Sequence, residues 1–245
     1  MSAGVRVEVA DGYVHLVLDE PARRNPLSRA RLAELRDALR TKADGVNAVV
    51  LSGAGTAFSA GADLTELTGT AADEAVDDAI AEAVHELTHA RALTVAAVEG
   101  PCRGAAVDVV LGCDVVLAGA SATFEVPAVR LGIMYNPDAV RRWAARLPRA
   151  TLVRLLLGEQ LDASQARAGG LVAEVVPTGS AVSAATELAQ RMAQLPPTVV
   201  AAVKELLVDL DDGADLTEAH LARRDLLASP DRLDALRTIR EGRNG

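Results

Sequence analysis

Alternating hydrophobic and polar residues open the chain and predict a β-hairpin. Val5, Val7 and Val9 alternate with polar residues, and the stretch YVHLVLDE follows directly after Asp11 and Gly12. A side-chain period of two is typical of a strand, and an Asp-Gly pair is typical of a tight turn between strands. We therefore expect two antiparallel strands on either side of that turn.

Longer spacings after the hairpin predict helices that alternate with short apolar strands. Leu32, Leu35 and Leu39 recur at helical spacing, which predicts a helix that begins near Ser28. VNAVVLSG is then a short buried strand, and the turn AGTAFSAGADL leads into a further helical segment. The repeated unit is strand, glycine turn, helix.

The same unit recurs through the middle of the chain. We expect a polar helix from about Asp73 to Ala90, a strand over 94–100, a turn PCRG and an apolar helix AAVDVVLG. DVVLAG and ATFEV predict a further pair of strands, AVRRWAARL and RATLVRLLLG predict helices, and GLVAEVVP predicts the last strand. This order predicts an α/β fold with short connections.

Only helices are expected from about Ala181 onward, with a break and restart at the PPT of residues 196–198. No linker rich in glycine or serine separates this part. We therefore predict a core over residues 1–180 and a helical C-terminal region over 181–245, whose apolar stripes suit contacts between subunits.

Charge and composition exclude several classes of partner. Half of the 245 residues are hydrophobic and the net charge is −9, with the two signs interspersed, so we expect neither a nucleic acid nor a membrane partner. Met1 to Ala10 is too polar for a signal peptide, and no apolar stretch approaches the roughly 20 residues that span a bilayer. A cytoplasmic protein is expected, with Cys102 and Cys113 as reduced core residues.

The stretch HELTH, residues 85–89, matches the pattern of a zinc metalloprotease helix. His85 and His89 share a helical face, and Glu86 could activate a zinc-bound water. A zinc protease needs a third ligand, and no histidine follows before His220. We therefore expect no metal site, and instead a helix that buries Val84 and Leu87 and leaves both histidines at a solvated or interface face.

Two glycine turns lead into predicted helices, at SAGADL and at GPCRGAAVD. The first N–H groups of a helix have no intrahelical partner, so such turns suit anions and developing oxyanions. If the two turns face one another, the backbone N–H groups of Ala62 and Ala105 form an oxyanion hole. Taken singly, each turn is also consistent with a tight connection.

Asp108 stands among apolar residues in the second of these helices. Burial of an unpaired carboxylate costs several kcal/mol, so this side chain needs a partner or a function. It projects from the face that carries Gly104 and Ala105, about one turn from the N–H of Ala105. Proton transfer is one interpretation, and a structural Asp bonded to a neighbouring loop is the other.

Together, RRNPLS after a hairpin, AFSAGADL after a strand, and VAAVEG before a glycine turn, an acidic residue and CD resemble the crotonase, or enoyl-CoA hydratase/isomerase, superfamily. The resemblance covers about residues 5–210. It implies a spiral of ββα units, assembly as trimers or hexamers, and a coenzyme A thioester whose carbonyl lies between two backbone N–H groups, here those of Ala62 and Ala105. No separate cofactor is implied, because coenzyme A is part of the substrate. The residues that the resemblance implies along coenzyme A are Arg23, Arg24, Asn25, Ala60, Gly61, Asp63 and Gly104.

The chain also departs from the family pattern. Hydratases of the family carry two glutamates, whereas Asp108 stands at the first position and Ala128 at the second. The usual glycine at the second N–H is Ala105. The usual PG and glycine run is replaced by IMYNPDAVRRW, which is similar to the branch that includes methylmalonyl-CoA decarboxylases and makes Tyr135 a candidate catalytic residue. Tyr135 could equally be a partly buried ring at a helix start, and for Asp138 a helix N-cap role is expected.

The sequence therefore predicts an acyl-CoA enzyme that stabilises a thioester enolate, with Asp108 as the proton-transfer residue, acting as a hydratase or an isomerase. Decarboxylation of a malonyl-type thioester is the first alternative, because it needs the oxyanion hole but no strong base, and Tyr135 favours it. A non-catalytic acyl-CoA-binding protein is the second alternative.

Overall fold

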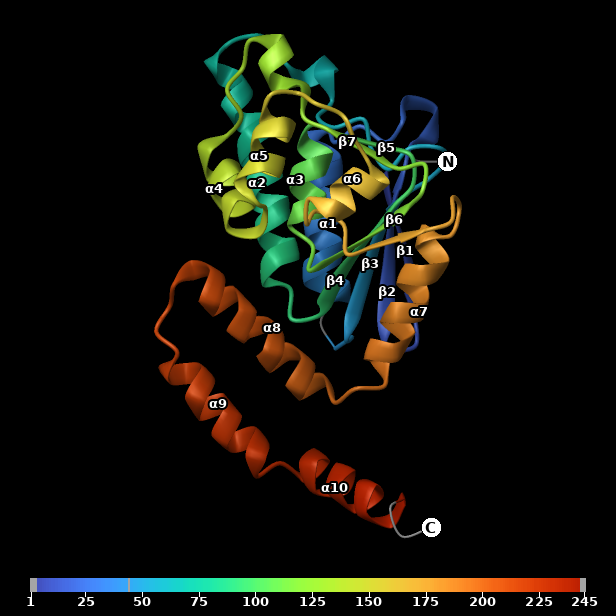
Figure 1. The fold of residues 1–245 in the computed structure, drawn as a ribbon, viewed down its shortest axis with the longest axis vertical. Coiled ribbons are helices and arrows are strands. Elements are labelled where there is room, and N and C mark those ends of the chain that lie inside the picture. The colour runs from blue at the N-terminus through green and yellow to red at the C-terminus, as the bar shows by residue number, and fades with distance from the viewer. Residues whose placement is uncertain (1–3, 44, 243–245) are drawn as a thin grey trace.

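A six-stranded sheet runs through the molecule, and helices cover both of its faces (Figure 1). The computed structural model describes residues 4–43 and 45–242, so a few residues of the two predicted regions lie outside the described part of the chain. The strand order is β1-β2-β3-β4-β6-β9, with β1 antiparallel to β2 and all other neighbours parallel. The strands span Gly4–Ala10 (β1), Tyr13–Asp19 (β2), Ala48–Gly53 (β3), Leu93–Val98 (β4), Val115–Gly119 (β6) and Glu174–Val176 (β9).

The predicted hairpin is confirmed. Ala10 pairs with Tyr13 across the two-residue turn, and the register continues to Gly4 opposite Asp19. β1 lies at the edge of the sheet, where Val7 and Val9 are exposed. The alternation of the first strand therefore does not mark a buried face.

A second, three-stranded sheet lies beside the first and corrects two sequence predictions. It contains β5 (Pro101–Arg103), β7 (Thr123–Glu125) and β8 (Leu161–Asp162) in the order β5-β7-β8. PCRG was predicted as a turn, but its first three residues form β5. DVVLAG and ATFEV were predicted to pair, but β6 already has neighbours at both edges, so the backbone groups of β7 pair with β5 and β8 instead.

Helices with the predicted spacing pack on one face of the large sheet. Ser28 caps α1 by accepting the N–H of Arg31, and Leu32, Leu35 and Leu39 are buried as predicted. The short α6 and the strand β8 were not predicted from the sequence. The helices of this part are α1 (Arg29–Lys42), α2 (Glu74–His89), α3 (Ala105–Leu111), α4 (Pro137–Arg146), α5 (Arg149–Leu156) and α6 (Ala163–Ala168).

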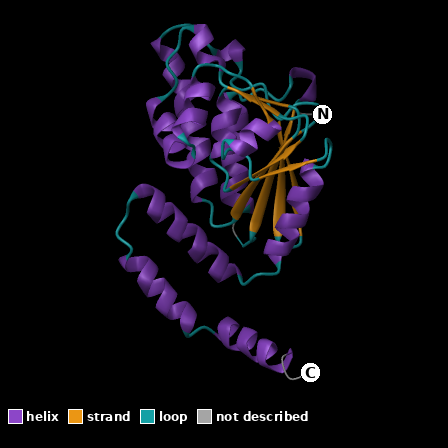
Figure 2. Ribbon diagram, viewed as in Figure 1, coloured by secondary structure: helices purple, strands orange, loops and turns teal. Residues whose placement is uncertain are grey.

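Four helices follow the last strand, as predicted: α7 (Ala181–Ala193), α8 (Pro197–Asp212), α9 (Thr217–Leu227) and α10 (Pro230–Gly242). The first of them packs its alanines on the second face of the sheet. Helix α8 then passes beside α2 and the sheet. Figure 1 and Figure 2 show that α9 and α10 continue away from them as separate helices. The division of the chain at residue 180 remains a prediction, since α7 belongs to the layer that covers the sheet. No helix within residues 4–43 and 45–242 is long and apolar enough to cross a membrane.

Candidate active site

The two turns that were predicted to carry the chemistry lie side by side. The Ser59 N–H donates to the Pro101 carbonyl (3.2 Å), and the Arg103 N–H donates to the Ser59 carbonyl (3.1 Å). A β-carbon on residue 61 would lie 2.5 Å from the Arg103 oxygen and 3.4 Å from the Ala105 nitrogen, and the φ of Gly61 is +89°. Glycine alone fits that backbone at so close an approach, so Gly61 brings the two turns into contact.

The N–H of Ala62 points away from Leu27. The Leu27 N–H donates to the Gly61 carbonyl (2.8 Å), and the Asp63 N–H donates to the Leu27 carbonyl (3.2 Å). Because the C=O and N–H of one peptide bond point to opposite sides, the Ala62 N–H is directed away from Leu27, which the Gly61 carbonyl faces. Among the described residues it donates to no protein group.

The first turn does not lead into an α-helix, and this sequence prediction was wrong. A single 3₁₀ turn over Leu64–Glu66 follows, capped by the Asp63 carboxylate, which accepts the N–H of Thr65 (3.0 Å). The residues after it are Thr68, Gly69 and Thr70, which favour turns. Ala62 therefore offers a single N–H donor and not the end of a helix dipole.

The second turn does begin an α-helix. Gly104 precedes α3 with φ +53°, and Ala105 is the first helical residue. The N–H of a first helical residue has no intrahelical acceptor. No other acceptor for the Ala105 N–H occurs in the described part of the chain. Two contacting turns thus each present one unpaired N–H.

Asp108 lies one helical turn beyond Ala105 and is buried, with 3% of its surface exposed. Two consecutive residues of α4 bind its carboxylate. Trp143 Nε1 donates to Oδ1 (2.8 Å), and Arg142 Nη2 donates to Oδ1 (3.2 Å) and Oδ2 (3.0 Å). The partner that a buried carboxylate needs therefore comes from a helix rather than from a neighbouring loop.

Burial is the largest cause of the shifted pKa values of the acid groups in this region. It raises the pKa of the Asp108 carboxyl above its ordinary value, while the charge of Arg142 and the hydrogen bonds from Trp143 and Arg142 act in the opposite direction. Burial, followed by the charge of Asp108, raises the pKa of Tyr135 well above its ordinary value. The pKa of Asp77 is also raised, by burial and then by Asp78 and Asp108.

Tyr135 lies next to Asp108 in space. Its partly buried ring packs on the indole of Trp143, with ring centroids 4.7 Å apart and an angle of 36° between the planes. Tyr135, Asp108, Arg142 and Asp77 line one small cavity of about 10 Å³, close to the minimum that holds a water molecule. The structure therefore brings the two predicted catalytic residues to one cavity.

The predicted N-cap role of Asp138 was wrong. Helix α4 begins at Pro137, and the cap is Asn136, whose side chain accepts the N–H groups of Asp138 (2.9 Å) and Ala139 (3.3 Å). The side chain of Asp138 is exposed and pairs with Arg141 (3.4 Å). The cap lies at the residue before the first helical position, which Pro137 occupies.

Residue 128, where the resemblance to the family implies a second carboxylate, is an alanine. Ala128 is a partly buried residue of the 3₁₀ helix Pro127–Leu131. The nearby buried Glu125 is bound by both Arg103 and Arg130. Its carboxylate therefore has two cationic partners already.

Residues implied along coenzyme A surround the first turn. Arg23 Nη2 donates to both carboxylate oxygens of Asp63, each at 2.9 Å. Arg24 is exposed with φ +61°, and its carbonyl accepts the N–H of the exposed Ala60 (2.8 Å). This edge presents the guanidinium of Arg24, which has no partner among the residues that the structure describes, and that of Arg23, which Asp63 holds.

The buried side chain of Asn25 connects the backbone segments beneath Arg24 by hydrogen bonds. It is fully buried, its Oδ1 accepts the Glu20 N–H (2.9 Å), and its Nδ2 donates to the carbonyls of Ala54 (2.9 Å), Ala57 (2.9 Å) and Phe58 (3.2 Å). All the hydrogen-bonding groups of the side chain are thus occupied. Its role in the structure is to fix the turn that displays Arg24.

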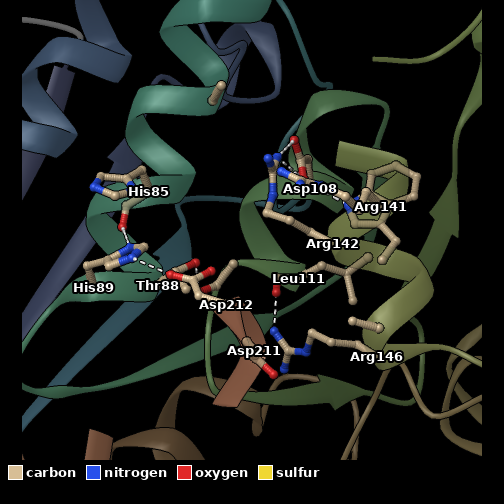
Figure 3. A pocket seen from close by; sticks show the side chains of 14 residues that line it. His85, Thr88, His89, Asp108, Leu111, Arg141, Arg142, Arg146, Asp211 and Asp212 are labelled. Carbon is tan, nitrogen blue, oxygen red and sulfur yellow. Dashed lines mark hydrogen bonds and ion pairs between the residues drawn. The ribbon is translucent and has the colours of Figure 1, made fainter. Parts of the chain in front are cut away.

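A larger cavity of about 270 Å³ also reaches Asp108, between α2, α3, α4 and the end of α8. Figure 3 shows His85 and His89 on one side of it and Asp108 and Arg142 on the other. Val84 and Leu87 are buried and both histidines are exposed, as predicted for HELTH.

The two histidines contact each other rather than a set of further ligands. Their ring centroids are 3.8 Å apart. His89 Nδ1 lies 2.9 Å from the carbonyl oxygen of His85, and His89 Nε2 lies 3.8 Å from Asp212 Oδ2. Within the described residues, no group of three or more His, Cys, Asp or Glu side chains is placed to hold a metal ion.

Arg142 and Trp143 are functional candidates that the sequence does not mark by a local motif. Both lie in a helix that was predicted from its pattern, 34 and 35 residues from Asp108. The available signals were the isolated acid in an apolar helix, which requires a partner, and the single tryptophan of the chain, whose indole N–H requires an acceptor when buried.

The parallel sheet, the second small sheet and the contacting glycine turns together define a crotonase fold. The sequence model of the enoyl-CoA hydratase/isomerase family matches residues 8–244, and the chain belongs to this family. It is 33% identical over 195 residues to the 2,3-dehydroadipyl-CoA hydratase of Escherichia coli, and the matched stretch covers 78% of this chain and 76% of that protein.

Two further relatives match most of the chain. Enoyl-CoA hydratase domain-containing protein 3 of Rattus norvegicus, a mitochondrial protein, is 31% identical over 240 residues, or 96% of this chain and 78% of that protein. The crystal structure of an enoyl-CoA hydratase/carnithine racemase from Magnetospirillum magneticum superposes with a TM-score of 0.91 at 26% identity, over 99% of this chain and 94% of that one.

Proposed function

We propose that the protein binds a coenzyme A thioester with its carbonyl oxygen between the N–H groups of Ala62 and Ala105, and that Asp108 transfers a proton at the acyl group. The observation that carries the proposal is the contact between two turns that each present an unpaired N–H. The buried carboxylate one helical turn away adds the group that a proton transfer needs.

The chemistry follows from where charge develops. When a proton leaves the carbon next to the thioester, or when water adds to a conjugated double bond, negative charge moves onto the carbonyl oxygen. Fixed N–H donors stabilise that charge, and loss of one such donor typically costs about 10²- to 10³-fold in kcat. The ionised Asp108 would accept the proton and return it to another carbon, or take it from an attacking water.

Hydratase or isomerase activity is the proposed outcome. One carboxylate suffices to move a proton between two carbons of the same acyl group, whereas hydration also needs a positioned water. The E. coli relative is named for hydration of a coenzyme A thioester. The small cavity beside Asp108 has about the volume that one water requires.

We also propose that coenzyme A lies along the first turn, beside Arg23, Arg24, Asn25, Ala60, Gly61, Asp63 and Gly104. The exposed Arg24 and Ala60 support this placement. The buried contacts of Asn25 support an indirect role, in which it holds the turn in shape.

Decarboxylation of a malonyl-type thioester is a second candidate, and two observations favour it. Tyr135 lines the same small cavity as Asp108. In addition, the Nε of Arg142 is buried without a hydrogen-bond partner in the described part of the chain, so a carboxylate of the substrate could accept from it.

Calorimetry followed by product analysis tests the proposal. Acetoacetyl-CoA should bind with micromolar or better affinity, unchanged by a chelator. Mass spectrometry of products from crotonyl-, 3-enoyl- and methylmalonyl-CoA then separates hydration, isomerisation and decarboxylation. No detectable binding at millimolar thioester would refute the proposed site, and binding without any product would favour the non-catalytic alternative.

A further inference from the structure

Two consecutive side chains of α4, one cationic and one neutral, donate hydrogen bonds to Asp108. Trp143 is 1% exposed and stacks on Tyr135, so its indole N–H is a fixed, neutral donor to Oδ1. Arg142 is the cationic partner and its Nη2 reaches both oxygens. The pair therefore fixes both the position and the charge of one carboxylate.

Three hydrogen bonds leave part of the carboxylate free. An ionised carboxylate has about four acceptor positions, two on each oxygen. Oδ1 accepts from Trp143 and Arg142, whereas Oδ2 accepts from Arg142 and from no other group of the described residues. Oδ2 is therefore the oxygen with room to take a proton from the acyl group and to return it.

Other charged groups near Asp108 do not replace Arg142. Arg146 donates to the carbonyls of Leu111, Cys113 and Asp114, and Arg141 pairs with the exposed Asp138. The titratable and charged groups that face Asp108 or share its cavities are Asp77, His85 and His89 of α2, Tyr135 before α4, Arg141, Arg142 and Arg146 of α4, and Asp211 and Asp212 of α8. Among them, only Arg142 forms an ion pair with the Asp108 carboxylate.

We propose that Arg142 is a positioning residue for the reaction, which holds Asp108 ionised and directs its Oδ2 toward the acyl group. This inference rests on the proposed role of Asp108 in proton transfer. Burial by itself disfavours the carboxylate form, and Arg142 opposes that effect. Without the guanidinium, Asp108 is expected to remain protonated to higher pH and to turn within its cavity.

The test compares three single variants on whichever thioester the wild-type protein converts. Arg142→Gln should lower kcat by roughly 10²-fold, the size of effect expected for a misplaced catalytic group, with a smaller change in KM. The acidic limb of its profile of kcat against pH should move to higher pH, because loss of the positive charge favours the protonated form of Asp108. Arg142→Lys keeps the charge and should restore the position of the acidic limb and part of the rate.

Arg141→Gln is the matched control. Arg141 is the preceding residue on α4, and its exposed side chain pairs with Asp138 rather than with Asp108. It should leave both the rate and the pH profile at wild-type values. An Arg142→Gln protein with wild-type kcat and acidic limb, beside an inactive Asp108→Asn protein, would overturn the inference while the proposed function stands.

Folding gives a second readout, because removal of Arg142 leaves a buried charge without its partner. If Arg142→Gln does not fold, the double variant Asp108→Asn/Arg142→Gln decides the point. A folded double variant shows that Arg142 is needed because Asp108 is charged, as proposed. A double variant that also fails to fold assigns Arg142 a role independent of Asp108 and contradicts the inference. Full activity of Asp108→Asn would instead refute the proposed function.

Discussion

At the scale of single residues, Asp108 is a carboxylate buried in an apolar helix, and its hydrogen-bond partners account for its presence there. A carboxylate with 3% exposure in an apolar helix would cost several kcal/mol if it were unpaired, and the hydrogen bonds from Arg142 and Trp143 oppose that cost. In the proposed oxyanion hole, Ala62 and Ala105 would contribute only their backbone N–H groups, so small side chains would suffice at both positions.

Substitutions at Asp108 and Tyr135 distinguish the two reactions. If Asp108 transfers the proton, Asp108→Asn should lose about 10²- to 10⁴-fold in rate with little change in thioester binding. If the reaction is a decarboxylation, Tyr135→Phe should cost more, because the phenol would orient the departing carboxylate or the enolate. Turnover of enoyl and malonyl-type thioesters by both variants measures the difference. Unchanged turnover in both would contradict the assignment of either residue.

Restoring a second acid gives a complementary prediction. Ala128→Glu should support hydration of enoyl thioesters, because a second carboxylate helps to hold water. The same change should weaken turnover of a malonyl-type substrate through repulsion between like charges. Steady-state rates on both substrate classes check this. Equal effects on the two classes would argue that residue 128 does not face the acyl group.

The sequence predicts candidate residues whose chemistry is local, and their catalytic roles remain predictions. The glycine turns and the isolated Asp108 are visible in short stretches of the chain. Arg142 could not be predicted, because its contact with Asp108 joins residues 34 positions apart on two different helices. The contacts of Asn25 were missed for the same reason, since its partners Ala57 and Phe58 lie more than 30 residues away.

At the scale of elements, one buried ion pair attaches α8 to the core. Lys204 is 3% exposed, and its ammonium group binds the Asp114 carboxylate and lies 3.5 Å from the Leu87 carbonyl oxygen. Asp114 also accepts the N–H (2.7 Å) and the hydroxyl (2.9 Å) of Thr94 at the start of β4. The end of α8 carries Asp211 and Asp212, which line the cavity beside Asp108.

Removal of the Lys204 charge should therefore release α8. Breaking a buried pair by removing one partner typically costs about 3–5 kcal/mol. Lys204→Ala is expected to raise hydrogen exchange across residues 197–212 more than in the strands of the large sheet. Lys42→Ala, at an exposed position at the end of α1, is the control. It should change hydrogen exchange neither in residues 197–212 nor in the strands of the large sheet. Unchanged protection of α8 in Lys204→Ala would mean that its apolar contacts alone hold it.

Hydrophobic periodicity predicted most helices and strands, and its errors have physical causes. A three-residue strand such as β5 gives no period to detect, so PCRG was taken for a turn. The partners of β6 and β7 depend on which edges remain free, which is a property of the assembled sheets and not of either segment. The helix expected after Ala62 stops after one 3₁₀ turn because turn-forming residues follow it.

At the scale of the whole molecule, the C-terminal helices expose a large apolar surface. They carry the exposed side chains of Val199, Val203, Leu207, Leu210, Leu221, Leu227, Leu233 and Ile239. Figure 1 shows α9 and α10 away from the sheet, and α9 contacts α8. Such surfaces are typical of subunit contacts, and we propose a homotrimer or homohexamer.

Light scattering checks the proposed assembly. The wild-type protein should have three or six times the mass of one chain at micromolar concentration. The double variant Leu221→Asp/Leu227→Asp should have a lower mass, because charges on α9 oppose burial of this surface. A wild-type monomer would contradict the prediction without bearing on the chemistry at Asp108.

Solvent deuterium exchange tests the central claim, which is that an enolate forms beside Asp108 with its oxygen between Ala62 and Ala105. A saturated acyl-CoA that cannot complete a reaction is incubated in D₂O, and loss of the proton next to the thioester is followed by NMR. The wild-type protein should catalyse this exchange, and Asp108→Asn should bind the thioester as before but exchange it at least about 10²-fold more slowly. Thioester binding without exchange in the wild type, or equal exchange in the variant, would contradict the account.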